Sequence, residues 1–347
     1  MLGRLANRAA VSALTIQYLE GGVWLPQLAL WLDAPRARKG PERVFVSHAH
    51  ADHTAAHREV IFSAPTAELM RARIRGQRVE HTLSFGEGRE FTGNQSSYRL
   101  TLLPAGHILG SAMALIEHAG HTLLYTGDFK TRPNLSSEPC DPALAVGCET
   151  LIMETTFGRP AYQFPPAERV LDDVIRFCRE ALADHATPVL LAYSLGKGQE
   201  VLCGLADCGL PIAIHPGVWR MTKIYEQFRC RFPPHELLEP DRAAGKVLIC
   251  PPQAVKSSVV QKLGRVRTAI VSGWAVEPGC RFRYGTDAAF PLSDHADFPE
   301  LIAFVKRVAP KTVLTLHGFA ADFAQSLREV GFDARALSEH EQLRLAL

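Results

Sequence analysis

The chain has 347 residues, which is long enough to bury a substantial core and suggests about two domains at roughly 150 residues each. This length excludes a peptide hormone or a disulfide-stapled mini-protein. With 47% hydrophobic and 21% charged residues, the composition also excludes a disordered or fibrous protein. The 38 Lys and Arg residues nearly balance the 36 Asp and Glu residues, so the net charge is only +2. A polyanionic partner would therefore have to bind a local basic patch.

The eight cysteines are scattered and form no C-x-x-C motif, in a chain too large to need disulfides. We therefore expect reduced thiols and a cytoplasmic protein. No run approaches the roughly 18 apolar residues of a membrane helix, and no signal-peptide pattern is found. Residues 1–10 contain two arginines and no acid, as in a transit peptide, but we expect them to run directly into a first strand.

In chain order, short apolar runs alternate with helical periodicity, which predicts an α/β fold. Strands are predicted at 28–32, 44–47, 100–103, 122–125, 150–153, 189–192, 246–250, 268–272 and 312–316. Helices are predicted to begin near Pro165-Pro166 and near Pro299, where proline and glutamate precede apolar residues at helical spacing. Because no long linker separates two halves, a second domain would be an insertion into the first.

The strongest motif is the segment 47–53, which follows the apolar run 44–46. It places His48, His50, Asp52 and His53 within six positions. On a turn that leaves a strand, the first two can project together while the other two reach a second site. A solvated loop would rarely acquire this spacing by chance, so the motif predicts a binuclear metal site.

Single potential ligands follow other predicted strands. His107 lies between glycines after the strand at 100–103, and Asp128 follows the strand at 122–125, where its carboxylate could bridge two cations about 3.5–4 Å apart. His295 precedes a predicted helix, and His317 follows the last predicted strand. Each of these residues is ambiguous alone, but together they complete the ligand set that a pair of metals requires.

The order of motifs is H-x-H-x-D-H, then a histidine, an aspartate, a strand-end acid, S-x-H-A-D and L-x-H-G. This order resembles the β-CASP nucleases of the metallo-β-lactamase fold, which include mRNA 3′-end cleavage endonucleases, ribonuclease J and Artemis-like DNA nucleases. The resemblance spans nearly the whole chain. It implies an αββα sandwich core formed by residues 1–160 and 286–347, with an inserted β-CASP α/β domain at 161–285.

The resemblance also implies seven ligands for two divalent metal ions, with Asp128 bridging the pair. The two ions would be held by two sets of three: His48, His50 and His107; Asp52, His53 and His317. Zn²⁺ is expected from the histidine-rich set, with Mn²⁺ or Mg²⁺ as alternatives for activity.

Three further positions match the family by motif. Asp33, in Leu32-Asp33-Ala34-Pro35, resembles the strand-end aspartate that orients the metal loop. Glu154 begins a segment that resembles the family's E-[ST]-T-[FY]-G element and would orient His295, which would protonate the leaving oxygen. Asp52 is expected to act in catalysis as well as in metal binding.

These roles agree with the chemistry of phosphodiester hydrolysis. The reaction needs a nucleophile that is available at neutral pH, neutralisation of charge on the phosphoryl oxygens, and a proton for the departing alkoxide. Two divalent cations supply the first two requirements. An imidazole paired with a carboxylate can supply the third.

Within the family, His317 favours the branch that resembles ribonuclease J and the 3′-end endonucleases. The segments 104–111, 154–158, 192–200 and 272–274 look most like bacterial ligase-associated DNA exonucleases, although serine is usual where Thr155 stands and alanine where Gly198 stands. This resemblance implies a metal-dependent exonuclease of single-stranded or frayed DNA ends in DNA repair. It also implies functional association with an ATP-dependent DNA ligase and a helicase.

Three alternatives remain at this stage: a β-CASP ribonuclease, a small-substrate metallo-hydrolase, and a non-catalytic nucleic-acid-binding subunit. Lys197 and Arg220 are predicted to contact nucleic acid. Lys197 stands in a turn at the start of a predicted helix, where backbone amides could meet a phosphate, and Arg220 begins a basic cluster that continues to Arg231. A second basic run spans residues 71–78.

Overall fold

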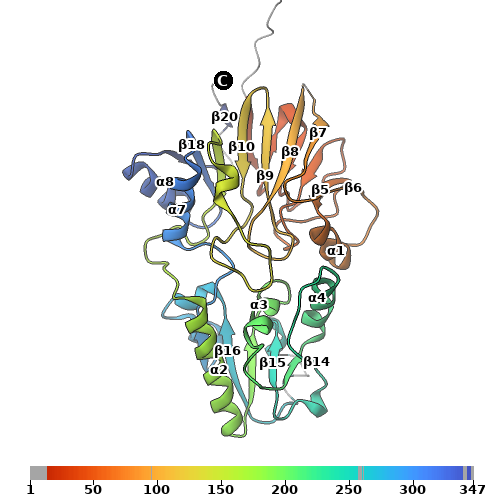
Figure 1. Ribbon diagram of the computed structural model, residues 1–347, viewed down its shortest axis with the longest axis vertical. Coiled ribbons are helices and arrows are strands. Elements are labelled where there is room, and N and C mark those ends of the chain that lie inside the picture. Colours follow the sequence, from red (N-terminus) through yellow and green to blue (C-terminus); the bar gives the residue numbers. More distant parts are fainter. Residues whose placement is uncertain (1–13, 95, 257–259, 261, 339–341, 345–347) are drawn as a thin grey trace, which may run out of the picture.

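The computed structural model describes residues 14–94, 96–256, 260, 262–338 and 342–344, and it forms two lobes stacked along the longest axis (Figure 1). The transit-like segment 1–10 lies outside the described residues. None of the described helices is both long and apolar enough to cross a membrane.

The upper lobe contains two mixed sheets of seven strands each. The first has the order β20-β1-β2-β3-β4-β5-β6, and the second has the order β19-β18-β11-β10-β9-β8-β7. The first is built from β1 (Thr15–Leu19), β2 (Gly22–Leu25), β3 (Leu30–Leu32), β4 (Arg43–Phe45), β5 (Glu59–Ser63), β6 (Val79–Leu83) and β20 (Gln342–Arg344). The second is built from β7 (Gly88–Thr92), β8 (Ser97–Pro104), β9 (Ala112–His118), β10 (His121–Tyr125), β11 (Thr150–Glu154), β18 (Thr312–Leu316) and β19 (Asp333–Ala336).

The two sheets pack face to face around one apolar core, to which Leu30 and Phe45 contribute from one sheet and Leu100 and Ile152 from the other. Helix α1 (Ala64–Arg73) covers the outer face of the first sheet. Helices α7 (Phe298–Val308) and α8 (Ala320–Glu329) cover the outer face of the second. The layers are therefore helix, sheet, sheet and helix, as the αββα prediction requires.

The lower lobe contains a third, entirely parallel sheet with the order β14-β13-β15-β12-β16-β17. Its strands are β12 (Thr187–Leu191), β13 (Ile212–Ile214), β14 (Glu236–Leu237), β15 (Val247–Cys250), β16 (Val266–Val271) and β17 (Ala288–Phe290). Its helices are α2 (Ala167–Ala183), α3 (Lys197–Gly204), α4 (Pro216–Gln227) and α6 (Cys280–Tyr284). Both faces of the sheet are buried, which explains why β12, β13 and β15 are continuous apolar runs.

Each strand predicted from the sequence overlaps an observed strand, although Leu28 closes a 3₁₀ turn instead of opening β3. Helix α7 begins where predicted because Asp297 and Glu300 cap each other's backbone amides. The boundaries at 160/161 and 285/286 stay a prediction. The pairing of β17 with β16 places residues 288–290 in the third sheet, which favours a return to the core after Phe290.

Candidate active site

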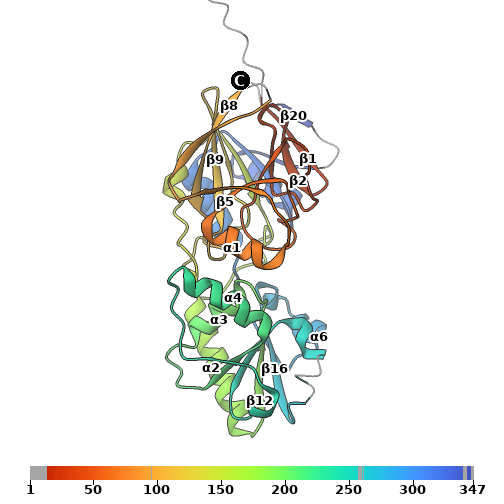
Figure 2. The same ribbon diagram turned by 90° about the vertical axis from the view of Figure 1, so that its right-hand side faces the viewer.

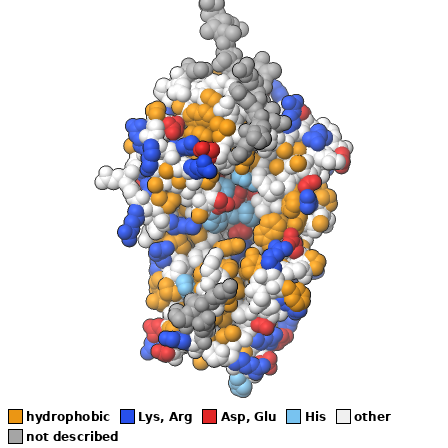
Figure 3. Space-filling view, turned by 180° about the vertical axis from the view of Figure 1, so that it is seen from behind, with side chains coloured by type: hydrophobic (Ala, Val, Ile, Leu, Met, Phe, Trp, Pro, Cys, Tyr) orange, Lys and Arg blue, Asp and Glu red, His pale blue; other side chains and the backbone are white. Residues whose placement is uncertain are grey.

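The predicted ligands gather where strands of the two upper sheets end. Strands β8, β10, β11 and β18 run in the same direction, so their carboxyl ends share one edge of the second sheet. His107, Asp128 and His317 follow three of these strands, and Glu154 closes the fourth. Strand β4 delivers the loop at 47–53 to the same edge from the first sheet. Figure 3 shows the histidines and acidic groups in a hollow between the lobes.

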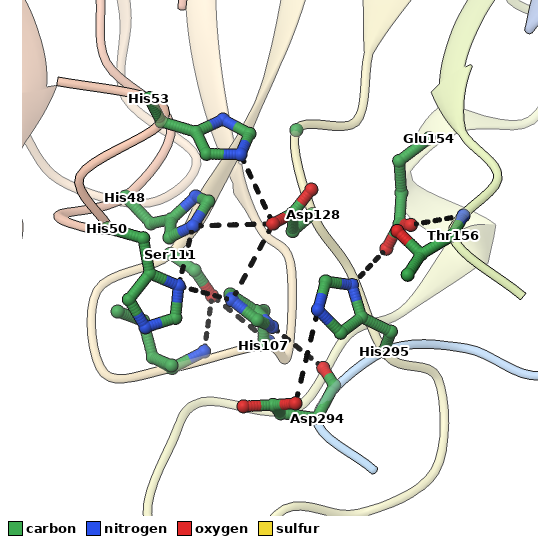
Figure 4. A network of polar contacts seen from close by, with 12 residues as sticks. His48, His50, His53, His107, Ser111, Asp128, Glu154, Thr156, Asp294 and His295 are labelled. Carbon is green, nitrogen blue, oxygen red and sulfur yellow. Dashed lines mark hydrogen bonds and ion pairs between the residues drawn. The ribbon is translucent and has the colours of Figure 1, made fainter. Parts of the chain in front are cut away.

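Three histidines turn one ring nitrogen each toward a common point (Figure 4). His50 Nδ1 lies 3.0 Å from His48 Nε2 and 3.1 Å from His107 Nε2. Asp128 Oδ2 lies 3.5 Å from His48 Nε2 and 3.9 Å from His107 Nε2. These four donors lie within 4.8 Å of one another, a spacing that suits one cation.

The other nitrogen of each ring is held by a separate partner. His48 Nδ1 lies 2.9 Å from Ser47 Oγ, and His107 Nδ1 lies 2.8 Å from the carbonyl oxygen of Asp294. His50 Nε2 lies 3.1 Å from the carbonyl oxygen of Leu195, in the lower lobe. Outer contacts of this kind set the tautomer and orientation of metal-binding imidazoles.

Burial lowers the pKa of all three rings, and the neighbouring histidines lower it further. The pKa of His50 falls to about 4. The imidazoles are therefore neutral at physiological pH, which is the form that binds metal. Nitrogen donors with a carboxylate are the ligands that zinc prefers, so the donor set fits the expected ion.

The second predicted ligand set surrounds His53. Its Nε2 lies 3.2 Å from Asp128 Oδ2 and 3.7 Å from Asp52 Oδ2, and its ring centroid lies 5.7 Å from that of His317. Burial opposes protonation of His53, but the charges of Asp128 and Asp33 outweigh it and raise the pKa of the ring well above its usual value. The two carboxylates that favour the protonated ring would also favour a metal cation at this place. Asp128 Oδ2 faces histidines of both sets, as expected of a bridging ligand.

Asp33 holds the loop at residues 47–53, which carries four of the predicted metal ligands. Its carboxylate accepts hydrogen bonds from the amide and hydroxyl of Ser47 at 2.7 and 2.6 Å and from the Tyr125 hydroxyl at 2.9 Å. It also contacts His53 Nδ1 at 2.9 Å. Asp33 adopts a left-handed backbone conformation with φ of 46°. Such strain persists only where surrounding contacts overdetermine it.

Buried Glu154 and the partly exposed His295 form a pair beside the cluster. His295 Nδ1 lies 2.9 Å from Glu154 Oε1, and the same carboxylate accepts the amides of Phe129 and Thr156. Burial lowers the pKa of His295, but the charges of Glu154 and Asp128 outweigh burial and raise it to about 10. The ring is therefore protonated at neutral pH and can donate a proton.

The prediction that Lys197 contacts nucleic acid is not supported by its position. The side chain is 1% exposed, and its ammonium lies 2.6 Å from Glu200 Oε2 and 3.8 Å from Asp294 Oδ1. Glu200 also binds Lys130 of the upper lobe at 2.6 Å. A buried ammonium would leave Glu200 underpaired if it turned toward a phosphate, so Lys197 links the lobes instead.

Arg220, the second predicted contact, does face the open cleft. The cleft has a volume of about 880 Å³, is lined from both lobes, and contains predicted metal ligands including His50, Asp52 and Asp128. Arg73 lines it from the core.

Several supporting groups escaped the sequence analysis. The carbonyl groups of Leu195 and Asp294 contact His50 and His107, two of the predicted metal ligands, and Ser47 and Tyr125 donate hydrogen bonds to Asp33. Carbonyl groups carry no residue signature, but the serine that directly precedes the histidine motif was a usable signal.

Known proteins match the C-terminal part of the chain and also nearly its whole length. The family model of a Zn-dependent metallo-hydrolase RNA specificity domain matches residues 288–337, which contain His295 and His317. A probable DNA ligase of Opitutus terrae is 52% identical over 94% of this chain. The 5′ exonuclease Apollo of Rattus norvegicus is 26% identical over 85% of the chain, and an RNase J-like protein of Methanocaldococcus jannaschii is 29% identical over 47%.

These similarities support a β-CASP member of the metallo-β-lactamase fold. The two upper sheets with their outer helices are the metallo-β-lactamase fold, and the lower lobe is the inserted domain. The chain covers 31% of the O. terrae protein, 54% of the R. norvegicus protein and 43% of the M. jannaschii protein.

Proposed function

We propose that this protein is a metal-dependent exonuclease that hydrolyses single-stranded or frayed DNA ends in DNA repair. One observation carries the proposal: the histidine and aspartate cluster lies beside the Glu154–His295 pair at the floor of an open cleft. The proposal therefore joins a metal-activated nucleophile to a proton donor within reach of one phosphodiester.

The chain's own residues divide the work of the reaction. His48, His50 and His107 would hold one ion, and the set around His53 a second, with Asp128 between them; Zn²⁺ is the ion proposed. Bound divalent ions would lower the pKa of a water molecule and neutralise phosphoryl charge. Asp52, whose side chain is 79% exposed, would face the reacting phosphate. His295 would give its proton to the leaving oxygen while Glu154 fixes the ring.

DNA is favoured as substrate because 94% of this chain matches a probable DNA ligase and 85% of it matches a 5′ exonuclease. The first match also supports functional association with a DNA ligase; the helicase rests on the family resemblance alone. All eight cysteines are free, which supports the cytoplasm as the compartment.

A ribonuclease is the second candidate, because the matching C-terminal model is described as an RNA specificity domain and one relative is named RNase J-like. A small-substrate hydrolase is less well supported, since the cleft is open and lined from both lobes. A non-catalytic binding subunit is disfavoured because every predicted metal ligand is present and buried except Asp52 and the partly exposed His50 and His317.

The test compares matched single-stranded DNA and RNA oligonucleotides, labelled separately at each end, with Zn²⁺ or Mn²⁺. We expect DNA to be degraded from one end, and the label first released as a mononucleotide gives the direction. The Asp52→Ala, His53→Ala variant should be inactive and should bind less metal by elemental analysis. Preferential loss of RNA would move the assignment to the ribonuclease, and inertness toward both despite bound metal would overturn nuclease function.

A further inference from the structure

Two arginines, Arg73 and Arg220, line the cleft but have no role in the predicted metal site. Helix α1 of the core lies against helix α4 of the inserted domain (Figure 2), and Leu69 of α1 packs with Met221 and Tyr225 of α4. Arg73 stands one turn after Leu69, and Arg220 directly precedes Met221. The packing therefore brings two guanidinium groups from different domains to one side of the cleft, where both line it.

These arginines differ from their neighbours in their partners. Arg71 pairs with Glu68 and Glu80, and Lys223 pairs with Glu226. In the described part of the chain, neither Arg73 nor Arg220 forms an ion pair; Arg73 donates to the carbonyl oxygen of Ala49 at 2.6 Å. Burial and the charge of Arg220 lower the pKa of Arg73, so the two groups repel each other. An anion between them would relieve that repulsion.

A second wall of the cleft presents aromatic rings. Tyr193 follows β12 and Trp274 follows β16, and these parallel strands are neighbours in the third sheet. Both residues line the cleft. Tyr193 is 44% exposed although it lies within the cleft, and Trp274 is anchored against Phe157 with ring centroids 4.7 Å apart. An exposed ring beside a charged cleft can stack on an unpaired base.

We propose that the cleft is a binding track for a single polynucleotide strand, in which Arg73 and Arg220 clamp backbone phosphates and Tyr193 stacks on a base. The inference rests on the proposed function and deepens it by assigning the groups that hold the strand. A base can stack on Tyr193 only when it is unpaired, so the track selects single strands or frayed ends over intact duplex. DNA and RNA share this chemistry.

The clamp is tested by the salt dependence of binding. Metal-loaded protein is titrated with a hydrolysis-resistant phosphorothioate DNA strand, read by fluorescence anisotropy at several salt concentrations. Each phosphate contact contributes about 0.7 to the slope of log affinity against log salt for single strands. Arg73→Ala and Arg220→Ala should each make this negative slope shallower by about 0.7. Arg75→Ala and Arg229→Ala, which remove equal charge from exposed positions outside the cleft lining, should not.

The aromatic contact is tested with two strands of equal length, one normal and one abasic. Tyr193→Ala should weaken binding of the normal strand about 5- to 150-fold, since stacking contributes about 1–3 kcal/mol per base. Tyr193→Ala should leave the affinity for the abasic strand unchanged. The Tyr193→Phe variant should bind both strands as tightly as the wild type does. Phe282→Ala removes an equally aromatic but 75% exposed ring outside the cleft lining and should change neither.

Failure of this inference is distinguishable from failure of the proposed function. If the wild type degrades oligonucleotides but the clamp variants keep the wild-type salt slope, the clamp is overturned and the nuclease stands. If Tyr193→Ala weakens both strands equally, stacking is overturned. A protein that binds strands as described but hydrolyses none would retain the track and overturn the nuclease. The same titration with RNA distinguishes the two polymers.

Discussion

At the scale of single residues, the site is organised by pairs of contacts. Each histidine of the first cluster has one nitrogen held by a hydroxyl or a carbonyl and the other directed at the common point. His295 differs, because its partner is the buried carboxylate of Glu154. The charges of Glu154 and Asp128 keep the His295 ring protonated, whereas burial and the neighbouring histidines keep the three rings of the first cluster neutral. The three neutral rings are therefore suited to binding a metal, and His295 is suited to donating a proton.

Substitution His295→Gln should expose this division. We expect turnover of an oligonucleotide to fall by about a hundredfold or more, since general acid catalysis contributes roughly 10²–10⁴-fold. A p-nitrophenyl phosphodiester, whose leaving group needs no proton, should lose far less, and metal content should not change. The control His185→Gln alters an exposed histidine of the lower lobe and should leave both rates intact. Equal losses on both substrates would instead assign His295 a purely structural role.

At the scale of elements, the turns that follow strands decide where ligands point. Gly106 precedes His107 and has a φ of +76°, and a Cβ there would overlap the carbonyl oxygen of Lys130. Only glycine fits this close approach. The turn therefore holds His107 in place through backbone geometry as well as through its contact with Asp294.

Gly106→Ala should consequently cost more than backbone strain alone. Gly120 is the matched control, because its φ is +86° but nothing lies within 4 Å of an added Cβ. We expect Gly120→Ala to lose about 1–2 kcal/mol of unfolding free energy, and Gly106→Ala to lose more and to bind less metal. Urea unfolding and elemental analysis measure both effects. Equal stability losses would show that the turn can relax around the added methyl group.

At the scale of the whole molecule, a buried charge network joins the lobes. Glu200 of the inserted domain accepts Lys130 of the core and Lys197 of its own helix, each at 2.6 Å. Burial would raise the pKa of Glu200, but the two ammonium groups outweigh it and lower the pKa. The network lies next to Asp294, so the seating of the inserted domain and the orientation of His107 depend on each other.

Glu200→Gln removes the carboxylate that pairs with both buried ammonium groups, so Lys130 loses its counter-charge and Lys197 keeps only Asp294, at 3.8 Å. We expect a loss of about 3 kcal/mol or more in unfolding free energy. The control Asp173→Ala breaks an exposed pair with Arg176 on α2 and should change stability by about 0.5 kcal/mol or less. Differential scanning calorimetry measures both variants. A Glu200→Gln protein as stable as the wild type would mean that this charge network does not stabilise the contact between the domains.

The sequence by itself determined the α/β class, the predicted strands and the candidate ligands. Side chains such as His48 and Asp128 can be recognised without coordinates, because the metal chemistry demands particular residue types directly after strands. These features depend on residue identity and local spacing. The pairing of Glu154 with His295 was implied only by the family resemblance, since the two residues lie in separate motifs 141 residues apart.

Only the tertiary structure decided the rest. Lys197 is predicted from the sequence to contact nucleic acid in a turn at the start of a helix, but packing of the two domains buries it against Glu200. The carbonyl of Leu195 reaches His50 across 145 residues, and Arg73 meets Arg220 only because α1 lies on α4. Backbone groups are chemically identical in every residue, and long-range packing is a property of whole surfaces. Neither leaves a local pattern in the sequence.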